Sequence, residues 1–178
     1  MEGVSKTVAR GIVLLRVVLG FGFLYAGLEK ALNFAGDDKA WSAAGFLKFA
    51  TAGTVPNMVG HPETMVHNAT RQFWVDLAGN ATVMDLVNVL VVVGEVAIGT
   101  ALILGLATRL AGTLGAVMMV LFWLATWDFQ YGVVNIQLLY AAVSGFLAYV
   151  RAGRYFGLDG ILERTDVIRR TPARFVVG

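Results

Sequence analysis

The chain has 178 residues, of which 57% are hydrophobic and only 15% are charged, and its formal net charge is +2. This composition excludes an ordinary soluble domain and favours an integral membrane protein. The lack of cysteine excludes disulfides and cysteine-ligated iron–sulfur clusters, and His61 and His67 both lie outside the apolar stretches, which argues against haem. We therefore expect no metal site, and the small basic excess indicates membrane topology, not nucleic-acid binding.

Four apolar segments are near the length of about 20 residues that a helix needs to cross a bilayer. They cover residues 8–32, 83–106, 109–127 and 133–150. The first is too long for a signal peptide, Arg16 interrupts it and no cleavage motif follows it, so we expect a retained helix. The sequence predicts one membrane domain, residues 1–178: an all-α, integral membrane, four-helix up-and-down bundle.

The positions of the basic residues predict the orientation of this bundle. Lys6 and Arg10 precede the first span, Arg109 lies in the link between the second and third, and six arginines lie in the tail of residues 151–178. Four spans place these three segments on one side, which should be the cytoplasm. We expect both termini there, with the loop of residues 33–82 outside.

The outer loop and the tail each predict short helices. AWSAAGFLKFA, residues 40–50, and ATRQFWVDLAGNA, residues 69–81, predict two amphipathic helices with aromatic residues suited to the headgroup level. Such helices either lie on the surface of the bundle or form a lid over a site that opens outward. In the tail, GLDGILERTD predicts a short helix with Asp159 near its start as the N-cap.

One carboxylate, Glu95, interrupts the apolar stretch LVNVLVVVGEVAIGTALILGL of residues 86–106. An unpaired charge near the bilayer centre costs about 3 kcal/mol, so Glu95 needs a partner or a proton. We expect Arg16 to be that partner, because antiparallel neighbouring helices would bring the two residues to similar depths. Such a pair either fixes the helix register or forms an ionisable site for a proton-coupled or quinone-like ligand.

Other polar and aromatic residues extend this candidate site. Lys30, Trp123 and Asn135 are expected near the outer surface, where Trp123 either lines the mouth of a site or belongs to the aromatic belt. Glu95 and Arg16 are the candidate catalytic residues. The candidate residues for binding a quinone or an anion are Arg16, Lys30, Glu95, Arg109, Trp123 and Asn135.

Three stretches of the chain resemble a known family. They are LLRVVLGFGFLYAGLEKAL (14–32), GEVAIGTALILGLATRLAG (94–112) and AGRYFGLDGIL (152–162). They resemble the DoxX/DoxD family of small four-helix membrane proteins, most specifically in the block G-E-x-x-x-G-x-x-L-x-L-G-x-x-T-R that runs from Gly94 to Arg109. The resemblance places these residues on family-typical positions: Arg16, Gly27, Lys30, Glu95, Gly105 and Arg109.

The resemblance also implies a redox setting. The DoxD branch is the membrane subunit of thiosulfate:quinone oxidoreductase, and the DoxX branch is associated with redox and oxidative-stress complexes in bacteria. The long loop between the first two spans is more similar to the DoxD branch. A multi-pass protein of the prokaryotic plasma membrane is therefore expected.

Three functions remain open from the sequence. The first is a membrane redox subunit that holds a quinone near Arg16, Glu95 and Arg109, and receives electrons from a small reductant such as thiosulfate, directly or through a partner. The second is a non-catalytic anchor, assembly or accessory subunit of a respiratory or oxidative-stress complex. The third, ranked last, is a small transporter or channel. Expected partners are the lipid bilayer and other membrane or respiratory subunits, with a homo-oligomer as an alternative.

Overall fold

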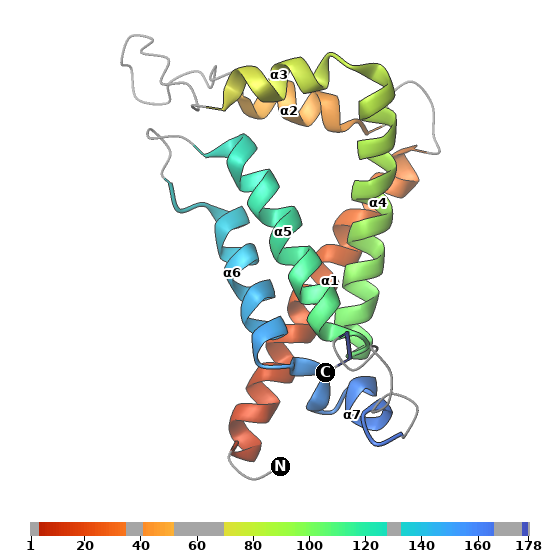
Figure 1. Cartoon of the computed structure of the whole chain (residues 1–178), viewed down its shortest axis with the longest axis vertical. Coiled ribbons are helices and arrows are strands. Elements are labelled where there is room, and N and C mark those ends of the chain that lie inside the picture. Colours follow the sequence, from red (N-terminus) through yellow and green to blue (C-terminus); the bar gives the residue numbers. More distant parts are fainter. Residues whose placement is uncertain (1–3, 35–40, 52–69, 128–132, 166–175, 178) are drawn as a thin grey trace.

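The computed structural model describes residues 4–34, 41–51, 70–127, 133–165 and 176–177 (Figure 1). All regular elements within these ranges are helices. Three of them are long and apolar enough to cross a membrane: α1 (Lys6–Phe34), α4 (Ala81–Leu104) and α5 (Thr108–Thr126). The all-helical class is thereby confirmed for the described residues, and three of the four predicted spans are helices of the length and composition that crossing requires. The predicted outer loop at 35–40 and 52–69, and the predicted tail at 166–175, lie outside the described residues.

The fourth predicted span is shorter than expected. Helix α6 (Ile136–Tyr149) is apolar, but its 14 residues extend only about 21 Å. At its start, the side chain of Asn135 accepts a hydrogen bond of 3.2 Å from the amide of Leu138, which caps the helix. At its end the chain turns at Arg151, which has a left-handed φ of 52°. The residues on either side of α6 are thus kept out of the helix.

The long helices form two pairs, α1 with α4 and α5 with α6. In the view of Figure 1 the pairs splay apart towards one end of the molecule, where α2 (Ala43–Thr51) and α3 (Arg71–Ala78) lie across them. The N-terminus, the C-terminus and the short helix α7 (Leu158–Leu162) all lie towards the opposite end (Figure 1).

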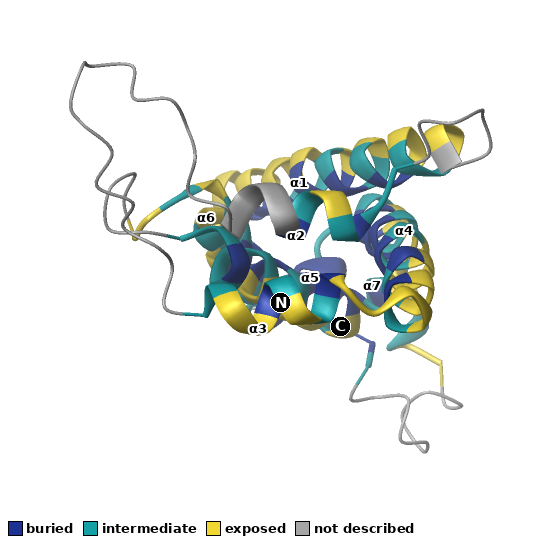
Figure 2. Cartoon of the chain, turned by 90° about the horizontal axis from the view of Figure 1, so that it is seen from above, coloured by how far each residue is buried: buried dark blue, intermediate teal, exposed yellow. Residues whose placement is uncertain are grey.

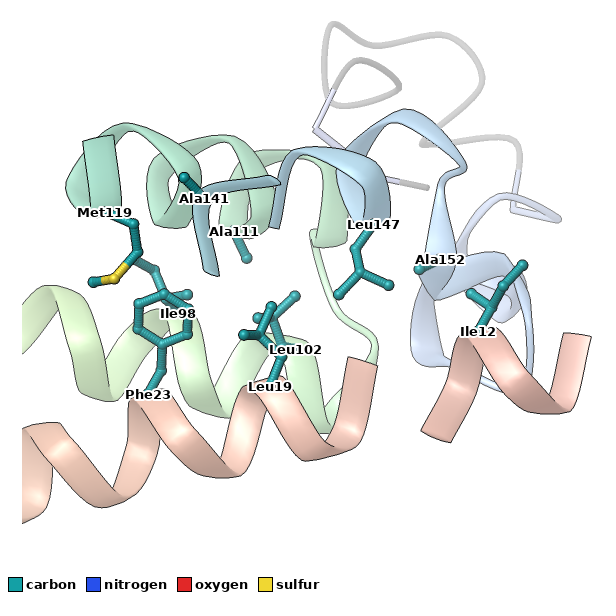
Figure 3. Packing of buried hydrophobic residues seen from close by; sticks show 10 residues of the cluster. All are labelled: Ile12, Leu19, Phe23, Ile98, Leu102, Ala111, Met119, Ala141, Leu147 and Ala152. Atoms are coloured by element: carbon teal, nitrogen blue, oxygen red, sulfur yellow. The ribbon is translucent and has the colours of Figure 1, made fainter. Parts of the chain in front are cut away.

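The main core lies between the two helix pairs (Figure 3). It is built from one large aromatic residue, aliphatic residues and several alanines: Ile12, Leu19, Phe23, Ile98, Leu102, Ala111, Met119, Ala141, Leu147 and Ala152. The outer faces are apolar as well, and Figure 2 shows exposed stripes along α1 and α4. Phe21 and Leu32 on α1, and Leu90 and Val93 on α4, are more than half exposed. Because lipid is as apolar as these side chains, such faces suit a bilayer and not water.

Three glycines bring α1 and α4 into close contact. A Cβ atom added at Gly99 would overlap the amide nitrogen of Leu24 and would lie 2.7 Å from the carbonyl oxygen of Gly20. A Cβ added at Gly27 would lie 2.8 Å from the amide nitrogen of Val96. Only glycine therefore allows the two backbones to approach this closely, and these contacts set the register between the helices.

The two short outer helices pack on the ends of α4 and α5. Their cluster contains Ala43, Leu47, Trp74, Ala78, Met84 and Ala125. The indole N–H of Trp74 donates to the hydroxyl of Thr70 at 2.9 Å and to the carbonyl of Leu124 at 3.2 Å. The two amphipathic helices predicted for the loop are confirmed, and they lie on the bundle.

We expect Gly99→Ala to destabilise the protein by about 1–3 kcal/mol, because the new methyl group meets backbone atoms that cannot rotate away. The measurement is chemical unfolding of the purified chain in detergent. Gly11→Ala is the control: Gly11 lies on the same helix pair, and nothing lies within 4 Å of its Cβ position. An equal loss of stability in both variants would contradict the packing argument.

Candidate functional site

The centre of the candidate site is an ion pair between α1 and α4. Both carboxylate oxygens of Glu95 accept hydrogen bonds from the ammonium of Lys30, at 2.9 and 2.8 Å. The side chain of Glu95 is 3% exposed and that of Lys30 is 18% exposed. The carboxylate is therefore buried within the protein, while part of the Lys30 side chain lies on the protein surface. Along the axis of α4, Glu95 lies about 21 Å from the first residue and about 14 Å from the last.

Lys30 makes two further contacts. Its ammonium donates to the carbonyl oxygen of Ala26 at 3.3 Å and lies 5.3 Å from the ring centroid of Trp41. A cation over an indole face at this distance gains roughly 0.5–2 kcal/mol, depending on solvent access. Trp41 lies two residues before the start of α2, so the ion pair is joined to the outer helices.

Asn88, one of the residues that sequence reasoning missed, strengthens this connection. It is buried on α4, and its side-chain oxygen accepts a hydrogen bond of 2.8 Å from the amide of Ala43, the first residue of α2. Asn88 interrupts the apolar stretch of α4 as Glu95 does, and this was the signal that could have identified it. Because Asn88 ties α2 to α4, it helps to hold Trp41 beside Lys30.

A shallow apolar groove opens between α1 and α4 in the neighbourhood of the ion pair, and neither Lys30 nor Glu95 lines it. It has a volume of about 170 Å³. Its lining residues are Ala31, Asn88, Val89, Val92 and Val93. Ala31 follows Lys30 in sequence, and Val92 lies about one helical turn before Glu95. Pockets for whole drug-sized ligands measure about 300–1,000 Å³, so this groove suits only part of a ligand, such as one ring or an isoprenoid unit.

The expected pair between Arg16 and Glu95 is wrong. Arg16 lies about 21 Å along α1 from Lys30, at the level of Gly105, where a Cβ would meet its guanidinium nitrogen at 2.6 Å. The expectation failed because it estimated the depth of each residue from the start of its own helix, as if the ends of the antiparallel helices α1 and α4 were level. In the structure, the first turns of α4 continue past the end of α1 and pack against α2.

Arg16 is instead buried against the polypeptide that follows α6. Its guanidinium donates to the carbonyl oxygens of Ala152, at 2.8 Å, and Tyr155, at 3.2 Å. Ala152 begins the 3-10 helix η1 (Ala152–Arg154). The side chain is only 1% exposed and interacts electrostatically with Asp159. Arg16 therefore anchors the tail to α1, far from the Lys30–Glu95 pair.

Asp159 also has a different role from the one expected. It does not cap α7, whose N-cap is Gly157. Its fully buried carboxylate accepts hydrogen bonds from the amides of Ala107 and Thr108, at 2.7 and 2.9 Å, and from the hydroxyl of Thr108 at 2.7 Å. These are the first amides of α5, so the tail caps a helix that lies about 50 residues earlier in the chain.

Trp123 and Asn135 lie together where α5 ends and α6 begins. The indole of Trp123 donates to the carbonyl of Val133 at 2.7 Å and stacks on Trp127. Asn135 caps α6 and donates to the hydroxyl of Thr126 at 3.2 Å. Within the described residues, no hydrogen bond or ion pair joins them to Lys30 or Glu95.

Arg109 lies on the first turn of α5, near Arg151. Among the six candidates, the described residues show a direct hydrogen bond or ion pair only between Lys30 and Glu95. Their geometry combines a cationic hydrogen-bond donor, a carboxylate proton acceptor, an aromatic ring and an apolar groove. In the part of the chain that the structure describes, no group of three or more His, Asp or Glu residues has the arrangement to hold a metal ion.

A comparison with protein families identifies the chain. The DoxX family model matches residues 11–127, which is more than half of the sequence. This protein belongs to the DoxX family. The matched part contains most of α1, the outer helices, α4 and α5, with Lys30 and Glu95 among its residues. Neither the curated proteins nor the solved structures contain a match to the chain.

We expect Glu95→Gln and Lys30→Met to destabilise this DoxX protein by about 3–5 kcal/mol each, because each leaves a buried charge without its partner. The double variant should recover most of that loss, since neither charge remains. Detergent unfolding of the four proteins measures the coupling. Glu29→Gln is the matched control, because it removes the same charge from an exposed position next to Lys30. Losses that simply add in the double variant would show that the pair has no mutual stabilisation.

Proposed function

We propose that this DoxX protein is the membrane subunit of a quinone-linked oxidoreductase system, and that the ring of a quinone binds beside Lys30 and Glu95. The observation that carries the proposal is an apolar groove on α1 and α4, the two helices that hold the buried ion pair, with Ala31 beside Lys30 in sequence and Val92 one turn from Glu95. Intramembrane charges are expensive and commonly mark ligand or proton sites. The groove would take an isoprenoid unit, and the ammonium would donate to a quinone oxygen.

The residues of the site match what quinone reduction requires. Conversion of a quinone to a quinol takes up two electrons and two protons. In the thiosulfate reaction of the DoxD branch, two thiosulfate ions would join through a new sulfur–sulfur bond to give tetrathionate and release both electrons. Glu95 would transfer one of the protons and Lys30 would stabilise the negative charge that develops on the quinone oxygen. A partner subunit or a direct two-electron reaction would deliver the electrons.

A second function is also supported. The charges of Lys30 and Glu95 balance each other, and both carboxylate oxygens accept hydrogen bonds from the ammonium. Ala26 and Trp41 provide the other contacts of the ammonium. Such a complete set of contacts suits a device that fixes helix register. On this reading the protein is a non-catalytic anchor or accessory subunit of a respiratory or oxidative-stress complex.

Mass spectrometry of the protein extracted gently from its native membrane distinguishes the two proposals. We expect a retained quinone, and a roughly tenfold loss of it in Val92→Trp, because the indole fills the groove; tenfold corresponds to about 1.4 kcal/mol of binding free energy. Val18→Trp is the control, since Val18 is exposed on α1 and does not line the groove.

Quinone reduction by the native complex gives the second readout. The Lys30→Met/Glu95→Gln variant should keep its fold and lose quinol formation, because neither the donor nor the proton carrier remains. Full activity in this stably folded variant would show that Lys30 and Glu95 take no part in quinone reduction. Recovery of the protein within a larger assembly, with no quinone of its own, would favour the accessory function.

We further propose that α6 crosses the membrane as a fourth span and that both termini face the cytoplasm of a prokaryotic cell. The basic residues support this orientation, because Lys6, Arg10, Arg109 and Arg151 all belong to segments at the end of the molecule where the termini lie (Figure 1). A helix of 14 residues is short for a span, and local thinning of the bilayer would accommodate it.

Because the natural chain has no cysteine, single cysteines report this topology cleanly. We expect Gln72→Cys on α3 to react with a membrane-impermeant maleimide in intact cells. Ser5→Cys and Thr165→Cys should react only after permeabilisation. Labelling of Thr165→Cys together with Gln72→Cys would mean that α6 does not cross the membrane.

A further inference from the structure

Three arginines from different parts of the chain gather where α5 begins and α6 ends. Arg109 lies on the first turn of α5, Arg151 lies two residues after the end of α6, and Arg154 ends η1. The amide of Gly153 donates to the hydroxyl of Thr108 at 3.0 Å, which holds η1 against the start of α5. The arginines therefore share one end of the helix pair.

The positive charge of this cluster is only partly balanced. Burial lowers the pKa of the Arg151 guanidinium, and the nearby charges of Arg154 and then Arg109 lower it further. Arg154 is paired with Glu163, with two nitrogens each 2.7 Å from one carboxylate oxygen. Within the described residues, no carboxylate forms an ion pair with Arg109 or Arg151. Within the described ranges the guanidinium groups of Arg109 and Arg151 thus face an external anion without an ion-pair partner, although the carboxylate of Glu163 attracts Arg151.

Apolar side chains are exposed close to the arginines in sequence, outside the long helices. Phe156 is 79% exposed and Ile161 is 64% exposed, and Leu158 is also exposed. Leu158 and Ile161 are three residues apart on α7 and therefore lie on one face. Phe156 keeps a left-handed φ of 51°, a conformation that costs roughly 1–3 kcal/mol for a residue other than glycine. An exposed apolar patch of this kind marks a surface that another molecule covers.

We propose that the segment after α6 docks on the membrane surface: Arg109 and Arg151 bind the phosphate of an anionic phospholipid, while Phe156, Leu158 and Ile161 insert among the acyl chains. Charge and position both favour a lipid as the occupant. The arginines lie at the ends of apolar helices, where headgroups are found, and Tyr149, 87% exposed at the end of α6, is typical of that level. The proposal depends on the start of α5 and the end of α6 lying at a bilayer surface, as in the topology proposed above. It does not depend on quinone chemistry.

The test uses the full chain in nanodiscs that contain phosphatidylcholine with a minority of phosphatidylglycerol, followed by native mass spectrometry of the lipids that stay bound. We expect phosphatidylglycerol to be enriched, and roughly a tenfold loss of enrichment in Arg109→Gln/Arg151→Gln. Lys6→Gln/Arg10→Gln is the matched control, because it removes two exposed positive charges from the same end of the molecule. An equal loss of phosphatidylglycerol enrichment in the two double variants would show that general charge attraction explains the binding. It would overturn the proposal of a specific site at Arg109 and Arg151.

A second arm separates a lipid from free phosphate. Phe156→Ser/Ile161→Ser should weaken retention of phosphatidylglycerol, and glycerophosphoglycerol, which has the headgroup without acyl chains, should not displace the lipid. Displacement by this soluble headgroup would show a simple phosphate site. For the unaltered chain, enrichment should fall as salt is raised, since salt screens exposed charges. No lipid preference, together with capture of an acidic soluble protein through the same arginines, would overturn the proposal in favour of a protein partner.

Discussion

The close contact of α1 with α4 at three glycines determines where Lys30, Glu95 and Arg16 lie relative to one another. A bilayer supplies no hydrophobic force between helices, so tight packing and polar contacts must specify their arrangement. At Gly20, Gly27 and Gly99 the backbones approach so closely that neighbouring registers would meet side chains. This one register brings Lys30 to Glu95 at one end of the contact and Arg16 to the tail at the other. Two polar centres therefore depend on a contact made without polar side chains.

The second of these centres explains why the tail belongs to the membrane domain. Asp159 caps the first turn of α5, and Thr108 links that turn to η1. Arg16 donates to carbonyls of the same segment and places a positive charge near Asp159. A buried carboxylate is tolerated only when it is well hydrogen-bonded, and here three donors and a nearby cation meet that condition. The result is a joint of α1, α5 and the tail that does not involve the apolar groove near Glu95.

Sequence reasoning found the elements because they depend on local patterns. Apolar stretches predicted α1, α4 and α5, and aromatic amphipathic segments predicted α2 and α3, all within a few residues. The polar partners could not be found in this way, because each is set by packing between distant segments. Arg16 was a reasonable partner for Glu95 by depth alone. Because α4 extends beyond the end of α1, however, Glu95 lies opposite Lys30 and pairs with it. Asp159 was expected to cap its own helix, whereas the amides that donate to its carboxylate lie about 50 residues earlier in the chain.

The contacts of Lys30 constrain how a ligand would enter the site. An ammonium has three N–H donors, and Lys30 directs them at two oxygens of Glu95 and one of Ala26. A quinone oxygen would therefore replace one of these acceptors, and Ala26 is the weakest at 3.3 Å. Trp41 lies on another side of the ammonium, and Asn88 holds α2 in place there. Ligand binding and the position of the outer helices would then be coupled, because a shift of Lys30 towards the groove also changes its contact with Trp41. The outer helices, which pack on the bundle as a surface layer, would in this way act on the site without covering it.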